Sequence, residues 1–218
     1  MTEAKRGRPR SFDREAALAQ ATRLFWEYGY EGTSIADLTR TMGISPPSLY
    51  AAFGDKRSLF TEVVERYGET FGAFMGRALE EESDVRTGFA RMLREAAVAY
   101  TDPMHPAGCL VITAAMNYSA QTADVERDLR QRRVANVRDF EERLTRAEKA
   151  GTLPQGAEPR ALAVYFAAVV QGMSQQARDG ASTAELERVA DLAMTAWLAP
   201  KDTITHRRHT ITNPYQDA

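Results

Sequence analysis

The stretch "GISPPSLYAAFGDK", residues 43–56, places two adjacent prolines in a region whose other residues favour a helix. Proline disrupts a helix interior, but it suits the first helical turn, where its missing N–H would have had no partner. The stretch therefore predicts a helix that begins after Ser45, its N-cap, and ends by Gly54. This helix is short, and the helices on either side of it explain why.

Apolar residues recur at three- and four-residue steps on both sides of this stretch. They predict a first helix that ends at Gly29 and a second that begins near Thr33 or Ser34. They also predict a long fourth helix, which is capped by Asp55 and continues through Met75. The first quarter of the chain is therefore expected to be a compact set of helices.

The second and third of these helices are joined by a tight turn at Gly43, which is the arrangement of a helix-turn-helix. A recognition helix has to fit a DNA major groove of ~12 Å width, bury one face and present polar groups on the other. Ile44, Leu49 and Phe53 are spaced to share one buried face. The pattern therefore predicts a DNA-binding module.

The distribution of charge supports this prediction better than the net charge of −2 does. Residues 1–60 hold nine Lys/Arg and seven Asp/Glu, a net of +2, so the remaining residues carry a net of −4. The extreme N-terminus gathers Lys5, Arg6, Arg8 and Arg10. A basic cluster of this kind is either a solvated tail or an arm that contacts DNA.

The rest of the chain has helical spacing and no sustained alternation typical of strands. Further helices are expected over residues 84–100, 107–118, 123–151, 159–179 and 183–198. The predicted fold is all-α, with about nine helices: a DNA-binding domain at 1–60, a ligand-binding and dimerisation domain at 61–200, and a tail at 201–218. The longest apolar runs fall far short of the ~20 residues that span a bilayer. One cysteine and no signal peptide favour the cytoplasm.

Residues 16–64, "AALAQATRLFWEYGYEGTSIADLTRTMGISPPSLYAAFGDKRSLFTEVV", resemble the tetracycline-repressor (TetR) family of bacterial transcriptional regulators. The resemblance rests on Phe-x-x-x-Gly-Tyr-x-x-Thr-Ser-Ile, on the Gly-Ile-Ser turn, and on Leu-Tyr-x-x-Phe followed by a lysine at the next helix start. It implies a homodimeric repressor that binds double-stranded operator DNA and is released from it by a small-molecule effector.

The resemblance also implies which residues contact DNA. Thr33, Tyr50 and Lys56 correspond to phosphate contacts, and the arginines of the N-terminal arm to minor-groove contacts. Pro46 and Pro47 depart from the family pattern: they offer apolar contact to a thymine methyl but donate no hydrogen bond. Base recognition then falls to nearby small residues, to the arm or to DNA shape. The expected DNA-binding residues are Arg6, Arg8, Arg10, Thr33, Ser45, Pro46, Pro47, Ser48, Tyr50 and Lys56.

The second domain of the family holds an effector cavity and a dimer interface. Aromatic and methionine side chains suit an apolar or aromatic effector, although each of them also suits a core. The expected ligand-binding residues are Phe71, Phe74, Met75, Phe89, Met92, Met104, Cys109, Ile112, Met116, Tyr118, Phe140 and Tyr165. The last two helices are expected to form the dimer through Tyr165, Phe166, Val169, Met173, Leu186, Val189, Met194 and Trp197.

Three alternatives stay open at this point. Cys109 in "HPAGCLV" is either a core residue or the thiol of an oxidant- or electrophile-sensing repressor, with His105 as a neighbouring cation. A small helical enzyme lacks a triad, a phosphate loop and a carboxylate pair. A protein-binding scaffold would not explain the helix-turn-helix. The histidines form no metal-ligand set, and no cofactor is expected.

Overall fold

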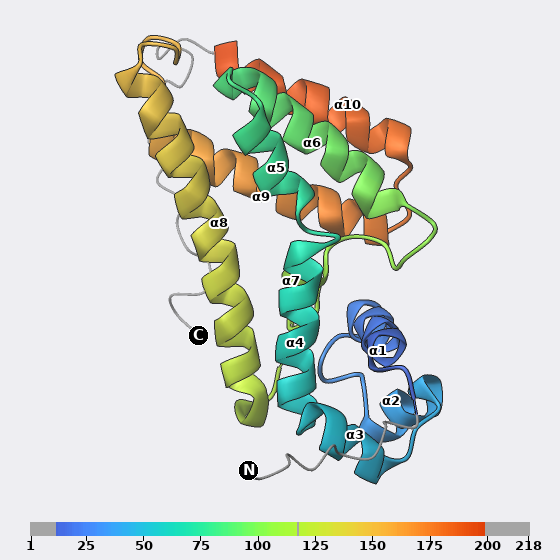
Figure 1. Cartoon of the computed structure of the whole chain (residues 1–218). Coiled ribbons are helices and arrows are strands. Elements are labelled where there is room, and N and C mark those ends of the chain that lie inside the picture. Colours follow the sequence, from blue (N-terminus) through green and yellow to red (C-terminus); the bar gives the residue numbers. More distant parts are fainter. Residues whose placement is uncertain (1–11, 117, 199–218) are drawn as a thin grey trace, which may run out of the picture.

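A computed structural model describes residues 12–116 and 118–198, so the arginines predicted for the N-terminal arm and the tail at 201–218 lie outside the described residues. Within these ranges the chain forms helices and no strands, which confirms the all-α prediction (Figure 1). The elements are α1 (Arg14–Tyr28), α2 (Ile35–Met42), α3 (Pro46–Phe53), α4 (Lys56–Glu69), α5 (Phe74–Glu81), α6 (Val85–Thr101), α7 (Leu110–Thr113), the 3-10 turn η1 (Ala120–Thr122), α8 (Ala123–Lys149), α9 (Pro159–Arg178), α10 (Thr183–Ala193) and the 3-10 turn η2 (Met194–Leu198).

The helix-turn-helix is confirmed, and local side chains fix its ends. Ser34 and Asp37 form a capping box at the start of α2. Gly43 ends α2 in the left-handed conformation at φ 63°, which glycine adopts without strain. Ser45 caps α3 by accepting a hydrogen bond from the backbone N–H of Ser48 at 3.3 Å. The turn geometry thus follows from the residues on either side of it.

The first three helices share a core with α4. Leu38 and Leu49 are fully buried, and the Phe60 ring of α4 lies 5.0 Å from the Phe25 ring of α1. Arg14 binds Glu62 at 2.5 and 2.6 Å and lies over the Phe53 ring. This single side chain therefore holds α1, α3 and α4 together.

The prediction of one long fourth helix through Met75 is wrong, because the chain turns between α4 and α5. The backbone N–H of Gly72 donates to the Tyr67 carbonyl at 2.8 Å. A Cβ at Gly72 would approach the Tyr67 ring to 3.2 Å, so this turn closes onto the aromatic side chain. The break thus depends on packing as well as on sequence.

The apolar helix expected over residues 107–118 is reduced to the single turn of α7. Gly108 explains why the helix does not begin earlier. Gly108 has φ 78°, and a Cβ there would lie 2.6 Å from the Ser174 carbonyl oxygen of α9. Cys109 N–H donates to the Ser174 hydroxyl at 2.9 Å. Close packing against α9 and the hydrogen bond to Ser174 therefore take the place of helical hydrogen bonds at residues 108 and 109.

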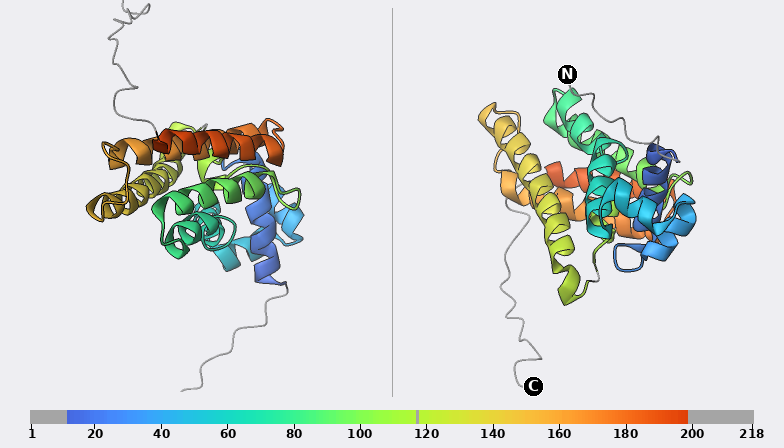
Figure 2. Two further views of the ribbon diagram at one scale, coloured as in Figure 1. Left: turned by 90° about the horizontal axis from the view of Figure 1, so that it is seen from above. Right: turned by 60° about the horizontal axis from the view of Figure 1, so that its bottom comes forward.

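The second domain is built around α8 and α9, which pack against each other, while α6 packs between α5 and α10. Figure 1 shows α1–α3 at one end of the molecule, with α4 leading from them toward the second domain. Figure 2 shows α9 and α10 along one side, with α4 and α5 on the other. Among the described helices, none combines the length and apolarity that crossing a membrane requires.

Gly108→Ala should destabilise the protein more than Gly151→Ala. Both glycines have positive φ, which costs an alanine about 1–2 kcal/mol. Only Gly108 is crowded, since nothing lies within 4 Å of a Cβ at Gly151. Overpacking should add about 1–3 kcal/mol at Gly108. Urea unfolding at equal protein concentration measures the difference, and equal losses would contradict the close packing of Gly108 on α9.

Candidate DNA interface and effector cavity

The outer face of α3 is polar but carries no charged side chain. Ser45, Pro46 and Pro47 are exposed, Ser48 is half-buried, and Tyr50 is 50% exposed. The Ser45 and Ser48 hydroxyls lie 2.9 Å apart and share a hydrogen bond. Hydroxyl groups, proline rings and one phenol are therefore the groups that this helix offers to a partner.

A cation is fixed at the start of the next helix. Lys56 is the first residue of α4, after the Asp55 cap, and its ammonium lies 4.2 Å from the centre of the Tyr30 ring. Burial lowers the pKa of Lys56, and the Glu31 carboxylate opposes this shift. The Tyr30 ring therefore holds the ammonium at one place beside the α4 N-terminus.

The Thr33 hydroxyl is turned inward. Thr33 is 1% exposed, and its hydroxyl donates to the Gly29 carbonyl at 2.8 Å. This geometry does not present the hydroxyl to a phosphate, and the exposed residue at the α2 N-terminus is Ser34. Sequence analysis did not single out Arg40, an exposed cation on α2 whose side chain pairs with Asp37. Thr33 thus shapes the turn that leads into α2.

A cavity of about 300 Å³ lies between α4, α5, α8, α9 and the segment that contains α7. Four of the predicted ligand-binding residues line it: Met75, Cys109, Ile112 and Phe140. Eight others lie elsewhere, some in the core and some on the surface, because spacing alone does not tell which side of a helix faces the cavity. They are Phe71, Phe74, Phe89, Met92, Met104, Met116, Tyr118 and Tyr165.

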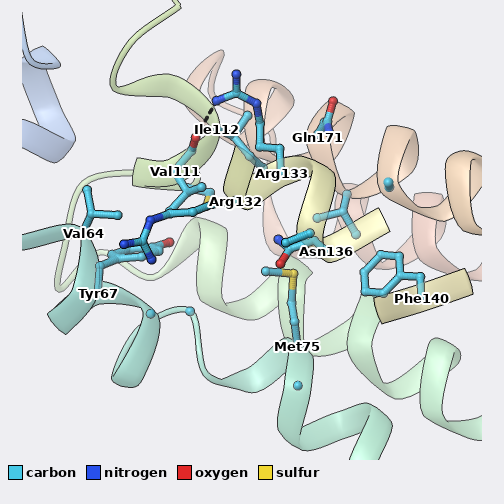
Figure 3. A pocket seen from close by; sticks show the side chains of 17 residues that line it. Val64, Tyr67, Met75, Val111, Ile112, Arg132, Arg133, Asn136, Phe140 and Gln171 are labelled. Carbon is cyan, nitrogen blue, oxygen red and sulfur yellow. Dashed lines mark hydrogen bonds between the residues drawn. The ribbon is translucent and has the colours of Figure 1, made fainter. Parts of the chain in front are cut away.

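The cavity also has polar walls that sequence analysis missed. Figure 3 shows Arg132, Arg133 and Asn136 of α8 and Gln171 of α9 around it. Tyr67 of α4 lies on the side toward which the Arg132 guanidinium points. The three α8 residues recur at one- and three-residue steps in a charge-rich helix, which is a pattern also typical of a solvated face. Their place in the cavity depends on how α8 is rotated against α4 and α9.

Cys109 lines the cavity but is 2% exposed. Burial raises the pKa of its thiol, and the Tyr67 phenol opposes this shift. The expected cation is used elsewhere: the His105 ring stacks on Trp26, with 4.4 Å between ring centres. In the part of the chain that the structure describes, no cluster of His, Cys, Asp or Glu is arranged to hold a metal ion.

The predicted dimer residues fall into two groups. Five are buried inside the protomer, so packing within the chain accounts for them: Phe166, Met173, Leu186, Met194 and Trp197. Tyr165, Val169 and Val189 keep surface exposure. Further small or apolar residues are exposed beside them on α9 and α10, namely Ala161, Val164, Ala168, Gly172 and Leu192. Helix α9 therefore has one apolar face in the core and a second one at the surface.

Side-chain bridges tie the DNA-binding helices to the second domain. Arg57 at the start of α4 pairs with Asp124 at 3.0 Å and with Asp128, both on α8. Arg178 at the end of α9 donates to the Trp26 carbonyl of α1 at 3.2 Å. The helices that line the cavity, α4, α8 and α9, are thus the helices that hold the helix-turn-helix in place.

Comparisons with known proteins agree with this architecture. Residues 17–63 match the family described as "Bacterial regulatory proteins, tetR family", and residues 88–193 match "Tetracyclin repressor-like, C-terminal domain". The HTH-type transcriptional repressor ComR of Escherichia coli (strain K12) is 36% identical over 88% of this chain and 92% of its own. BdcR, another such repressor from that strain, is 32% identical over 86% of this chain and 90% of its own.

A solved structure shows such a fold on DNA. A cysteine mutant of the TetR family transcriptional regulator CifR, complexed with 26-bp double-strand operator DNA, is 39% identical and superposes with a TM-score of 0.84. The match covers 88% of this chain and 100% of the CifR chain. These relatives are regulators rather than enzymes. The helix-turn-helix, the helical second domain and these matches show that the chain belongs to the TetR family of DNA-binding transcriptional repressors.

Proposed function

We propose that this protein is a cytoplasmic, homodimeric repressor that binds its operator through α3 and is released by a small effector in the cavity. Residues 1–60 would bind DNA, and residues 61–200 would bind the effector and the second subunit. The observation that carries the proposal is the exposed outer face of α3, held by a capped helix-turn-helix like that of a relative solved on operator DNA.

A gel shift with the DNA upstream of the protein's own gene and of its neighbours tests this function. A shift that survives excess unrelated DNA is the expected result, since specific binding typically exceeds non-specific binding by ~10³-fold or more. Equal competition by unrelated DNA for every fragment would count against an operator-binding repressor.

Tyr50→Phe and Lys56→Ala should each weaken binding to the operator and to a scrambled sequence alike. The expected partners are phosphates, which occur in every sequence. Loss of Lys56 should also reduce the slope of log affinity against log salt by about one unit, because one fewer counterion is released. Fluorescence anisotropy over a series of salt concentrations measures both effects.

Lys149→Ala is the matched control, because Lys149 is exposed at the far end of α8 from the helix-turn-helix. Its affinity and salt slope should equal those of the wild type. If the Tyr50 and Lys56 variants also matched the wild type, neither residue would belong to the interface.

The exposed apolar side of α9 and α10 supports the dimer. Val164, Tyr165 and Leu192 are 46%, 36% and 68% exposed, although all three are apolar or aromatic. Ala168 and Gly172 continue the strip along α9 at four-residue steps, and small residues allow close approach of a second helix. A two-fold dimer through this side would present two copies of α3 to two DNA half-sites.

Ala168→Arg should convert the dimer to monomers. The substitution places a cation in the middle of the apolar strip, where burial without a partner costs several kcal/mol. Light scattering at micromolar concentration measures the change in mass. Tyr28→Arg serves as the control, since Tyr28 is 63% exposed but lies on α1, and it should stay dimeric. A dimeric Ala168→Arg variant would place the interface elsewhere.

Helices α4 and α8 each extend from the cavity to the start of α4 at the DNA-binding end, which supports release by an effector. Val64 and Tyr67 of α4 line the cavity, and Lys56 and Arg57 stand at the DNA-binding end of the same helix. Helix α8 likewise contributes Arg132 to the cavity and Asp128 to the Arg57 pair. A ligand that fits one position of these helices better than another would shift the spacing of the two DNA-binding domains.

The alternative of thiol sensing is disfavoured by the burial of Cys109. A raised pKa leaves little thiolate near neutral pH, since each pKa unit lowers the thiolate fraction about tenfold. Because the sulfur is also buried, iodoacetamide should label native Cys109 more slowly than the unfolded chain, and Cys109→Ser should keep its DNA affinity. Fast labelling that also releases DNA, and that the serine variant abolishes, would make the protein a thiol sensor.

A further inference from the structure

We infer that the effector is a small organic acid whose negatively charged group binds Arg132, while its apolar body lies among the aliphatic and aromatic walls of the cavity. This inference rests on the proposed function and specifies the chemistry of the ligand. The arrangement of charge inside the cavity carries it.

The cavity wall is positively charged. Arg132 and Arg133 line it, and no Asp or Glu is among its described lining residues. Asn136 and Gln171 add amide groups that donate hydrogen bonds. Guanidinium and amide N–H donors together are the groups that bind a carboxylate.

The two arginines differ in whether their guanidinium groups already contact other protein groups. Arg133 donates to the Val111 carbonyl at 3.0 Å and lies 3.4 Å from the Glu126 carboxylate. Figure 3 shows this side chain turned toward Val111, with Arg132 directed to the Tyr67 side. Across residues 12–116 and 118–198, the arginines of α8 that form hydrogen bonds or ion pairs are Arg130, Arg133 and Arg143, and none of these contacts involves the Arg132 side chain. Arg132 is therefore the cation that remains for a ligand.

The rest of the lining defines the body of the ligand. Val64, Met75, Ile112, Phe140 and Val170 supply aliphatic and aromatic surface. A volume of about 300 Å³ is at the lower end of the ~300–1,000 Å³ typical of ligand pockets. A neutral hydrocarbon would leave the guanidinium without a partner, and a cation would be repelled by it. A compact organic acid would pair its anionic group with the guanidinium and place its apolar body against the aliphatic and aromatic side chains.

The position of Arg132 also connects the ligand to DNA binding. Arg132 follows Asp128 by one helical turn on α8, so the two side chains lie on neighbouring positions of the helix surface. Asp128 holds Arg57 at the start of α4. An anion bound to Arg132 would thus act directly beside the pair that joins α8 to the DNA-binding domain.

Three probes with one skeleton and different head groups test the inference: 4-phenylbutyrate, 4-phenylbutanol and 4-phenylbutylamine. Calorimetric titration into the full-length protein should show the carboxylate binding at least about tenfold more tightly than the alcohol, as one charge-assisted hydrogen bond provides. The amine should bind most weakly. Arg132→Gln should bring the carboxylate and the alcohol to similar affinity.

Two further variants keep the result interpretable. Arg132→Lys retains the charge and should keep part of the preference for the carboxylate, and Arg127→Gln, an exposed arginine of α8 outside the cavity, should keep all of it. Equal or tighter binding of the alcohol or amine to the wild type would overturn the inference. So would no carboxylate binding at millimolar concentration, or a preference that survives Arg132→Gln.

DNA binding without any probe separates this inference from the proposed function. The wild-type protein should bind the operator when no probe is present, because DNA binding by the proposed function needs no ligand. A protein that binds operator DNA but shows no preference for the acid would refute only the ligand chemistry. A protein that binds no operator would refute the proposed function, whatever the probes do.

Discussion

The burial of α4 on two sides is the constraint on which the rest of the structure depends. Its Phe60 ring packs on Phe25 and Tyr30 in the core of the helix-turn-helix, at 5.0 Å from each ring centre. One turn later, Val64 and Tyr67 line the cavity of the second domain. A packed helix moves as a unit, because close-packed interiors do not absorb local displacement. The helix-turn-helix and the cavity therefore share a rigid element.

The outer face of α3 carries no charged side chain, so most of the affinity for DNA and the recognition of bases would come from different residues. Phosphate attraction supplies most of the affinity of such proteins, and it requires cations. The described DNA-binding helices place Lys56 beside this face, while Arg57 is held by Asp124 and Asp128. Under the proposed function, the basic cluster of the N-terminal arm would add further attraction, and α3 would distinguish bases by DNA shape and apolar contact.

Sequence was sufficient where the determinants are local. Gly43, Ser45 and Asp55 end or cap their helices through their own backbone or side chains, so the helix-turn-helix was predictable. The break after α4 was not, because Gly72 closes onto Tyr67 only in the folded chain. The cavity was predictable only in part, since the rotation of α8 decides that Arg132 faces inward. A charged helix of this composition looks solvated until its neighbours are known.

The cost of placing Arg132 in the cavity argues for a functional reason. The Arg132 guanidinium lines the cavity together with Val64, Met75 and Phe140, and a guanidinium beside apolar groups loses part of its hydration. A hydrophobic residue would fill the same space at less expense. A ligand shifts a conformational equilibrium only by its different affinity for the two states. Under the inference above, a cation on the helix that also holds Arg57 would provide such a difference, because the energy gained on binding an anion would depend on the position of α8 relative to α4.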